Sequence, residues 1–140
     1  MEYEKSVAVA AEPARAWAVL SDLERWPARI PTYEEVRRLD DGDLRVGSRA
    51  FVKQKGLVAG EWEVSELVDG RTFTWACRQP GVRIVGRHHV TTNTDGTTRL
   101  TLVLEQTGWL SGLVSMLMGR KIKRYVDLEA EALKEAAEAA

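Results

Sequence analysis

The stretch that decides the fold begins Trp109-Leu-Ser-Gly-Leu-Val-Ser-Met-Leu-Met-Gly-Arg120 and continues to Ala140. Apolar side chains recur in it at steps of three and four residues, the period of an amphipathic helix. They are Leu110, Leu113, Val114, Leu117, Met118, Ile122, Tyr125, Val126, Leu128 and Leu133. Because Ser111 can cap the start, the pattern predicts one long helix from about Trp109.

The apolar side of this helix is wider than one packing stripe, and it includes polar residues. Lys121, Tyr125 and Glu129 follow one another at steps of four, which places them on one face. Polar groups on the buried side favour a partly hollow core. Tyr125 lies near the middle of that side, so it contacts either a ligand or packed neighbours. Lys121 is expected to reach water at the edge, and Glu129 to be exposed or salt-bridged.

The chain before this helix is dominated by segments with the period of two that is typical of strands. A first strand is predicted near Tyr3–Val9, and a helix over Pro13–Leu20. A second short helix is expected to start at Ser21, and Trp26–Pro31 is expected to form an extended connector. Asp-Gly pairs between the later segments indicate hairpin turns, and there is no room for crossover helices, so the sheet is expected to be antiparallel. These segments are Tyr33–Leu39, Ser48–Gln54, Glu61–Val68, Thr72–Gln79, Val82–Thr92 and Thr97–Thr107.

One face of the predicted sheet is apolar and the other is polar, which indicates that helices cover one face. The apolar positions are Phe51, Trp62, Val64, Phe73, Trp75, Ile84, Val90, Leu100, Leu102 and Leu104. We therefore predict an α+β fold of order β-α-α-β6-α, in which a seven-stranded curved antiparallel sheet wraps around the C-terminal helix. With 44% hydrophobic residues, the chain suffices for one domain over residues 1–140.

Composition argues against several function classes. Lys plus Arg (20) nearly balances Asp plus Glu (21), so a net charge of -1 offers no global attraction for nucleic acid. A single cysteine, Cys77, excludes an internal disulfide and a thiolate-rich zinc site. No apolar run reaches the roughly 18 residues of a membrane span, and the first residues do not resemble a signal peptide. We expect a soluble, cytoplasmic monomer or homodimer without integral membrane association.

Several short phrases, in order, resemble those of a known group. They are Glu12–Trp17, Asp22–Pro27, Gly47–Ala50, Glu61–Val64, Phe73–Trp75, Gly86–His88 and Gly108–Leu110. Together they resemble the START-like helix-grip (SRPBCC) superfamily and, within it, the polyketide cyclase/dehydrase and lipid transport family. The resemblance covers nearly the whole chain and implies a hydrophobic cavity between helix and sheet. It fixes no catalytic residue, because the family includes carriers, cyclases and ligand sensors.

Candidate site residues follow from the covered face. His88 and His89 point to opposite faces of a strand, so they cannot hold one metal ion together. His88 shares the covered face with Gly86, either as a hydrogen-bonded core residue or as a partner for ligand oxygen. Trp62 and Trp75 are either core or cavity wall. The expected ligand-binding residues are Phe51, Trp62, Trp75, His88, Met118, Lys121 and Tyr125; we predict no metal, no cofactor and no catalytic residue.

Three functions remain open. The first is a carrier or sensor that binds a hydrophobic small molecule such as a lipid, isoprenoid or polyketide-like compound. The second is a cyclase or dehydratase in which His88 acts as acid or base and Tyr125 or Lys121 polarises a carbonyl. The third is an interaction module of the coenzyme-Q-chaperone type that docks through Arg120, Lys123 and Arg124. The loop from Gly56 to Gly60 is either a flap over the cavity or an ordinary hairpin loop.

Overall fold

The computed structural model describes residues 1–139, and it has the predicted order of elements. The N-terminal part comprises β1 (Glu2–Val9), α1 (Pro13–Ser21), η1 (Leu23–Arg25) and α2 (Trp26–Arg29). Six strands follow: β2 (Tyr33–Arg38), β3 (Arg49–Gln54), β4 (Gly60–Val68), β5 (Thr72–Gln79), β6 (Val82–Thr92) and β7 (Thr98–Thr107). The chain then forms α3 (Ser111–Glu138). Ala140, which the sequence assigns to the long helix, lies outside the described residues.

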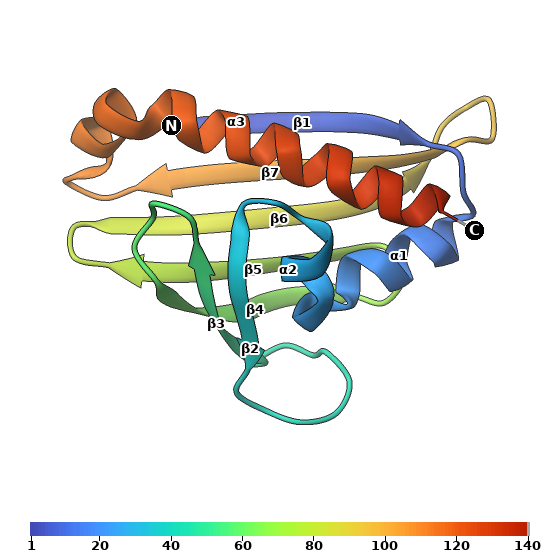
Figure 1. The fold of residues 1–140 in the computed structure, drawn as a ribbon, viewed down its shortest axis with the longest axis horizontal. Helices are drawn as coiled ribbons and strands as arrows, with labels where there is room; N and C mark the ends of the chain where they lie inside the picture. The colour runs from blue at the N-terminus through green and yellow to red at the C-terminus, as the bar shows by residue number, and fades with distance from the viewer. Residues whose placement is uncertain (140) are drawn as a thin grey trace.

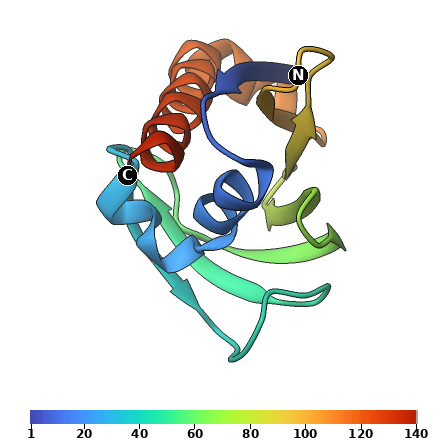
Figure 2. The same cartoon turned by 90° about the vertical axis from the view of Figure 1, so that its right-hand side faces the viewer.

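The seven strands form one antiparallel sheet in the order β1-β7-β6-β5-β4-β3-β2 (Figure 1). The sheet curls around the helices, and α3 and α1 lie in its concave side (Figure 2). The predicted helix-grip fold is therefore confirmed. Among residues 1–139, no helix combines the length and the hydropathy needed to cross a membrane.

The Asp-Gly turns have the backbone that the sequence predicts. Gly70 joins β4 to β5 with φ of 79°, and Gly96 joins β6 to β7 with φ of 87°. Side chains other than hydrogen rarely tolerate positive φ, so glycine at these positions allows the tight reversal. The turn at Gly96 joins β6 to β7, whose pairing places His88 opposite Leu102. On its other side β6 pairs with β5, which places Phe73 opposite His88.

One end of the concave side is tightly filled. Trp26 and Phe73 have no exposed surface, and the Trp26 indole N–H donates to the Leu20 carbonyl oxygen at 3.1 Å. The C-terminal half of α3 presents the buried residues Ala130 and Leu133 here. Small side chains let α3 approach α1 closely, so this end has the dense packing of an ordinary core.

Three local predictions were wrong. Trp26–Arg29 is a helical turn and not an extended connector, because Pro27 sits in the first turn, where a missing N–H costs nothing. Ser21 ends α1 and its hydroxyl donates to the Trp17 carbonyl oxygen at 2.8 Å, so it does not begin the next helix. Ser111 donates to the Gly108 carbonyl oxygen at 2.7 Å and offers no side-chain cap to α3.

Candidate functional site

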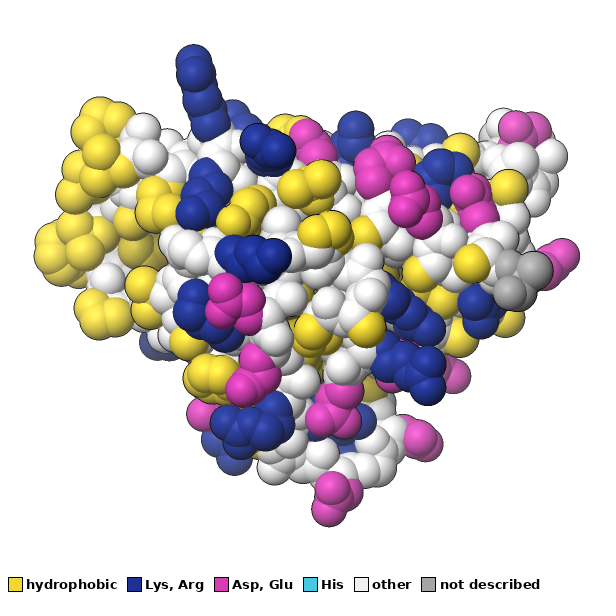
Figure 3. Space-filling view, in the orientation of Figure 1, with side chains coloured by type: hydrophobic (Ala, Val, Ile, Leu, Met, Phe, Trp, Pro, Cys, Tyr) yellow, Lys and Arg dark blue, Asp and Glu magenta, His cyan; other side chains and the backbone are white. Residues whose placement is uncertain are grey.

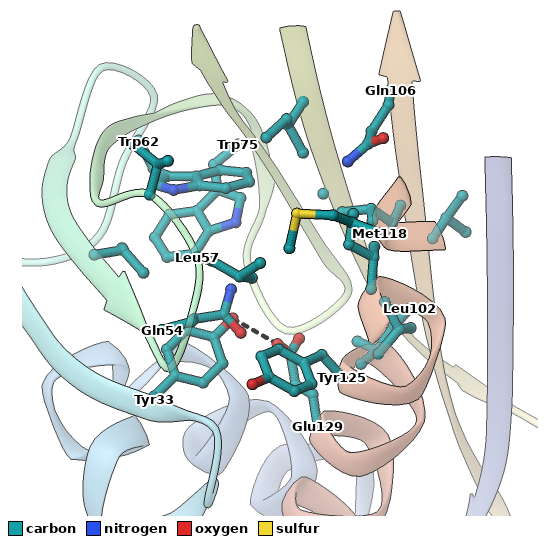
Figure 4. A pocket seen from close by; sticks show the side chains of 18 of the residues that line it. Tyr33, Gln54, Leu57, Trp62, Trp75, Leu102, Gln106, Met118, Tyr125 and Glu129 are labelled. Atoms are coloured by element: carbon teal, nitrogen blue, oxygen red, sulfur yellow. Dashed lines mark hydrogen bonds between the residues drawn. The ribbon is translucent and has the colours of Figure 1, made fainter. Parts of the chain in front are cut away.

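The other end of the concave side holds a cavity of about 240 Å³ between α3 and the sheet. Val114, Met118 and Ile122 line it from the N-terminal half of α3. Strands β2 to β7 and the β3–β4 loop (residues 55–59) supply the remaining walls (Figure 4). Most of the lining is apolar, so the cavity suits a hydrophobic small molecule rather than a charged one.

Two tryptophans form one wall of the cavity. The ring centres of Trp62 and Trp75 lie 5.3 Å apart, and the ring planes are inclined at 40° (Figure 4). Within residues 1–139 neither indole N–H donates a hydrogen bond, whereas that of Trp26 does. Gly86 lies beside Trp75 and contributes no side chain to fill the space. The pair therefore has the character of a cavity wall, with flat surfaces and free donors for a ring system.

Three polar side chains meet at the side of the cavity nearer the filled core. The Tyr33 hydroxyl donates to Oε1 of Glu129 at 2.6 Å (Figure 4). Nε2 of His88 lies 3.6 Å from Oε2 of the same carboxyl group. All three line the cavity, although they come from β2, β6 and α3. We call Tyr33, His88 and Glu129 the polar trio.

The hydrogen-bond pattern fixes the tautomer of His88. Nδ1 lies 3.1 Å from the Phe73 carbonyl oxygen, which can only accept, so Nδ1 carries a hydrogen. Nε2 therefore presents to Glu129 either a second proton or a lone pair. The imidazole is also held in place by stacking on Phe73, with ring centres 4.1 Å apart.

Tyr33 is the fixed donor of the trio. Burial, the charge of Glu129 and the hydrogen bond to that carboxyl group all raise the pKa of Tyr33 well above its ordinary value of 10.0. The phenol therefore stays protonated at neutral pH and holds one oxygen of Glu129. The arrangement leaves the trio able to exchange a proton with a bound molecule through His88 or Glu129.

A further polar group lies toward the other end of the cavity. Gln106 on β7 is only 4% exposed and lines the cavity, and its Oε1 has no hydrogen-bond partner within residues 1–139. A buried carbonyl oxygen without a partner is costly, so Gln106 favours a ligand or water that donates to it. Ile84, which lies opposite Gln106, is four residues from His88 along β6. Gln106 and the polar trio are thus roughly 13 Å apart along the strand direction.

The β3–β4 loop is fastened to α3. The Tyr125 hydroxyl donates to the Lys55 carbonyl oxygen at 2.7 Å, and the Lys53 ammonium donates to the Leu57 carbonyl oxygen at 2.8 Å. Leu57 and Val58 line the cavity, so the loop forms one side of it.

Five of the seven expected residues line the cavity: Trp62, Trp75, His88, Met118 and Tyr125. Phe51 does not, and its assignment to the covered face was wrong. Ala50 and Val52 face inward, while Phe51 pairs with Glu61 on the outer face and lies 5.3 Å below the Arg37 guanidinium. Apolar residues occupy both faces of β3, so alternation alone could not choose between them.

Lys121 also lies outside the cavity. Its ammonium is beside Gly56 and 5.6 Å from the centre of the Tyr125 ring. Glu129 was expected to be exposed at an edge or salt-bridged. It lines the cavity, with its Oε2 at 3.6 Å from Nε2 of His88, so the exposed alternative was wrong. Its spacing from Met118, Ile122 and Tyr125 at steps of three and four was the signal that could have placed it there.

Two other chemistries gain no support from the described residues. Burial raises the pKa of the Cys77 thiol, which therefore stays protonated and is a poor nucleophile. Residues 1–139 contain no group of three His, Cys, Asp or Glu side chains placed to hold a metal ion.

Comparisons with known proteins place this geometry in context. The family model for "polyketide cyclase / dehydrase and lipid transport" matches residues 1–138. No curated protein matches the chain in sequence. Among solved structures, the Zhui aromatase/cyclase from Streptomyces sp. R1128 is similar, with a TM-score of 0.80 and 18% identity over 99% of this chain and 93% of that one.

Two further structures share the fold. A START superfamily protein from Mycobacterium smegmatis has a TM-score of 0.73 and 19% identity over 98% of this chain and 97% of that one. A truncated norcoclaurine synthase from Thalictrum flavum has a TM-score of 0.71 and 16% identity, covering 96% of this chain and 91% of the other. At these identities the structural likeness establishes the fold alone.

Proposed function

Because the chain belongs to the polyketide cyclase/dehydrase and lipid transport family, we propose that it binds a hydrophobic small molecule in the cavity under α3, as a carrier or sensor. The observation that carries this proposal is an apolar cavity whose polar groups lack partners within residues 1–139. They are above all the Gln106 carbonyl oxygen, which is buried, and the Trp62 and Trp75 N–H groups. A filled core would satisfy such groups internally.

The size of the cavity narrows the ligand class. Drug-sized ligands occupy pockets of roughly 300–1,000 Å³, and this cavity has about 240 Å³. A two-chain lipid is therefore too large. A compact ring system or one short chain fits better, with an oxygen near each end to meet Gln106 and the polar trio. Isoprenoid or polyketide-like compounds have this character.

Ligand binding is tested with a named probe, 2-naphthol, and a variant that fills the cavity. Ile84→Trp places a large ring in the cavity, whereas Val46→Trp adds the same ring at a position that is 60% exposed. We expect Ile84→Trp to weaken 2-naphthol binding at least tenfold and Val46→Trp to leave it unchanged, as measured by tryptophan fluorescence. Equal binding by wild type and Ile84→Trp would disprove the proposed site. Native mass spectrometry of the purified protein then identifies the carried compound.

A second candidate function, a cyclase or dehydratase, is favoured by the polar trio. In such a reaction Nε2 of His88 takes a proton from a carbon between two carbonyl groups. The resulting carbanion attacks a ketone carbon, a carbon–carbon bond forms as the carbonyl π bond breaks, and the alkoxide takes the proton back from Nε2. The hydroxyl then leaves as water with the second proton of the attacking carbon, and a carbon–carbon double bond forms. Tyr33 and Glu129 position the imidazole. Tyr125 and Lys121 do not take the carbonyl-polarising role here, because Tyr125 donates to Lys55 and Lys121 lies outside the cavity.

The two functions are separated by Glu129→Gln, which keeps the shape of the side chain and removes its acidity. With a linear poly-β-ketone thioester as substrate, we expect turnover to fall about 10²-fold or more if the trio catalyses, while binding changes little. His88→Ala is expected to act in the same direction. Equal losses of binding and turnover would favour simple binding, and unchanged turnover would remove the trio from the chemistry.

A further inference from the structure

An exposed apolar surface lies where α3 begins. Trp109 is 83% exposed in the β7–α3 connection, and Leu113, Met116 and Leu117 on the first two turns are 49%, 74% and 71% exposed. We call these four residues the apolar tip. In the space-filling view, hydrophobic side chains gather at this end of the molecule (Figure 3). Large apolar side chains clustered in water mark an interaction site rather than a folding requirement.

The apolar tip explains the width of the apolar side of α3. Val114 and Met118 face inward and line the cavity, while Met116 and Leu117 face outward on the same turns. This helix is therefore apolar on two sides over its first two turns. Only the inner side is explained by packing against the sheet.

The outward stripe of α3 changes from apolar to basic after Leu117. Arg120, Lys123 and Arg124 continue it at helical spacing, are exposed, and form no salt bridge within residues 1–139. From residue 107 to residue 126 the sequence has four Lys or Arg residues and no Asp or Glu. This stretch therefore has a net charge of +4. Because the whole chain has a net charge of -1, the remaining residues have a net charge of -5. Positive charge is thus concentrated beside the apolar tip (Figure 3).

This combination favours one kind of partner. Trp, Leu and Met suit the interface and acyl region of a bilayer, and Lys and Arg suit anionic headgroups. Six residues separate Leu117 from Lys123, which is about 9 Å along a helix, so the basic side chains lie within two turns of the apolar tip. A second copy of the chain fits less well, because a twofold contact at the tip would bring two basic clusters together.

We propose that the apolar tip docks this protein on the surface of an anionic lipid bilayer, with Trp109, Met116 and Leu117 inserted and Arg120, Lys123 and Arg124 on the headgroups. The proposal goes beyond the ligand-binding function and does not depend on what the cavity holds. Val114 and Met118 share these turns with the tip, so docking brings this end of the cavity against the bilayer. A hydrophobic ligand could then pass without crossing much water.

Sedimentation of the full chain with vesicles tests the proposal. We expect binding to phosphatidylcholine vesicles that contain roughly one third phosphatidylglycerol, and little binding to pure phosphatidylcholine. Each basic residue near an anionic surface strengthens binding about fivefold, so Arg120→Gln/Lys123→Gln is expected to bind about 25-fold more weakly. Trp109→Ser/Met116→Ser/Leu117→Ser is expected to lose binding. All three serines replace exposed side chains, so circular dichroism melts should match wild type.

Matched controls lie elsewhere on the surface. Arg71→Gln/Arg99→Gln removes the same charge at the opposite end of the sheet, where β5 and β7 begin. Leu39→Ser/Val46→Ser/Val68→Ser removes three other exposed apolar side chains. Both controls should bind like wild type, and so should the filled-cavity variant Ile84→Trp, which separates docking from ligand binding.

Several results would overturn the proposal. They are absence of wild-type binding to the anionic vesicles, equal losses in the control variants, and undiminished binding of the triple serine variant. Tip-dependent dimers in analytical ultracentrifugation, without vesicle binding, would assign the surface to a second copy. Capture of an acidic protein without vesicle binding would assign it to a protein partner.

Discussion

The two halves of α3 face the same sheet and yet enclose opposite kinds of interior. The C-terminal half uses small side chains such as Ala130 and Ala137, and the space beneath it is filled. The N-terminal half uses the larger Met118 and Ile122, and the space beneath it holds the cavity. The difference comes from α1 and α2, which lie against the C-terminal half and not the other (Figure 1). A curved sheet covered by a single helix leaves room that side chains do not fill.

The tryptophans show the same contrast in their hydrogen bonds. Trp26 at the filled end donates to a backbone carbonyl, and Trp62 and Trp75 at the hollow end have no such partner among residues 1–139. Residue size and burial are therefore insufficient to identify a core tryptophan. Whether its N–H is satisfied distinguishes packing from a surface kept for a ligand.

The largest effect should follow removal of the filled end's central side chain. Trp26→Ala deletes a ring with no exposed surface that contacts Tyr33 and Trp75 at 5.2 Å and 5.5 Å between ring centres. We expect the free energy of unfolding to fall by about 3–5 kcal/mol, as measured by urea denaturation. A loss below about 1 kcal/mol would mean that this end is not tightly packed.

Trp75→Ala should affect ligand affinity more than stability. One side of Trp75 already faces the cavity, so its removal is expected to cost less than about 3 kcal/mol of unfolding free energy and to weaken 2-naphthol binding at least tenfold. Urea denaturation and fluorescence titration measure the two effects. If the free energy of unfolding fell as far as in Trp26→Ala while the affinity for 2-naphthol was unchanged, Trp75 would belong to the filled core. The contrast between the two ends of the interior would then be wrong.

Tyr33 lies at the boundary between the filled end and the cavity, and the pH dependence of stability should reveal its burial. Below pH 10, the ordinary pKa of tyrosine, the protonated Tyr33 side chain contributes fully to the free energy of unfolding. At higher pH the unfolded tyrosine ionises while the folded one stays protonated, so the unfolding free energy should fall by about 1.4 kcal/mol per pH unit. This decline should be shallower in Tyr33→Phe.

Tyr3 provides the control for that measurement. Its pKa is also raised, first by a hydrogen bond to Asp127, but it lies outside the cavity. The difference between Tyr33→Phe and Tyr3→Phe above pH 10, from urea denaturation at each pH, isolates the buried group. Identical profiles in the two variants would show that Tyr33 is not the group that gives the alkaline decline.

The smallest effect is expected at the β3–β4 loop. Tyr125→Phe removes one exposed hydrogen bond to Lys55, which should cost about 0.5–1.5 kcal/mol of unfolding free energy. Because the loop forms one side of the cavity, the ligand's dissociation rate should rise more than its association rate falls. Stopped-flow fluorescence with 2-naphthol measures both rates. Unchanged dissociation would mean that the ligand does not pass this loop.

Local patterns in the sequence determined the elements and most of the cavity wall. The period of two, the Asp-Gly turns and the helical period gave the strands, hairpins and α3 nearly to the residue, because these preferences act between near neighbours. The covered face predicted for β4 to β6 put Trp62, Trp75 and His88 at the cavity. The docking role of the basic cluster and the identity of the ligand stay proposals.

Tertiary structure decided what depends on distant pairing. Phe51 faces outward because Ala50 pairs with the inward-facing Trp62, a choice that an apolar strand does not encode on its own. Tyr33 and Glu129 are 96 residues apart and form a hydrogen bond only because β2 reaches across to α3. Sequence period assigns a side chain to a face of its own element, whereas meeting across elements depends on how the sheet curls and where the helix lies on it.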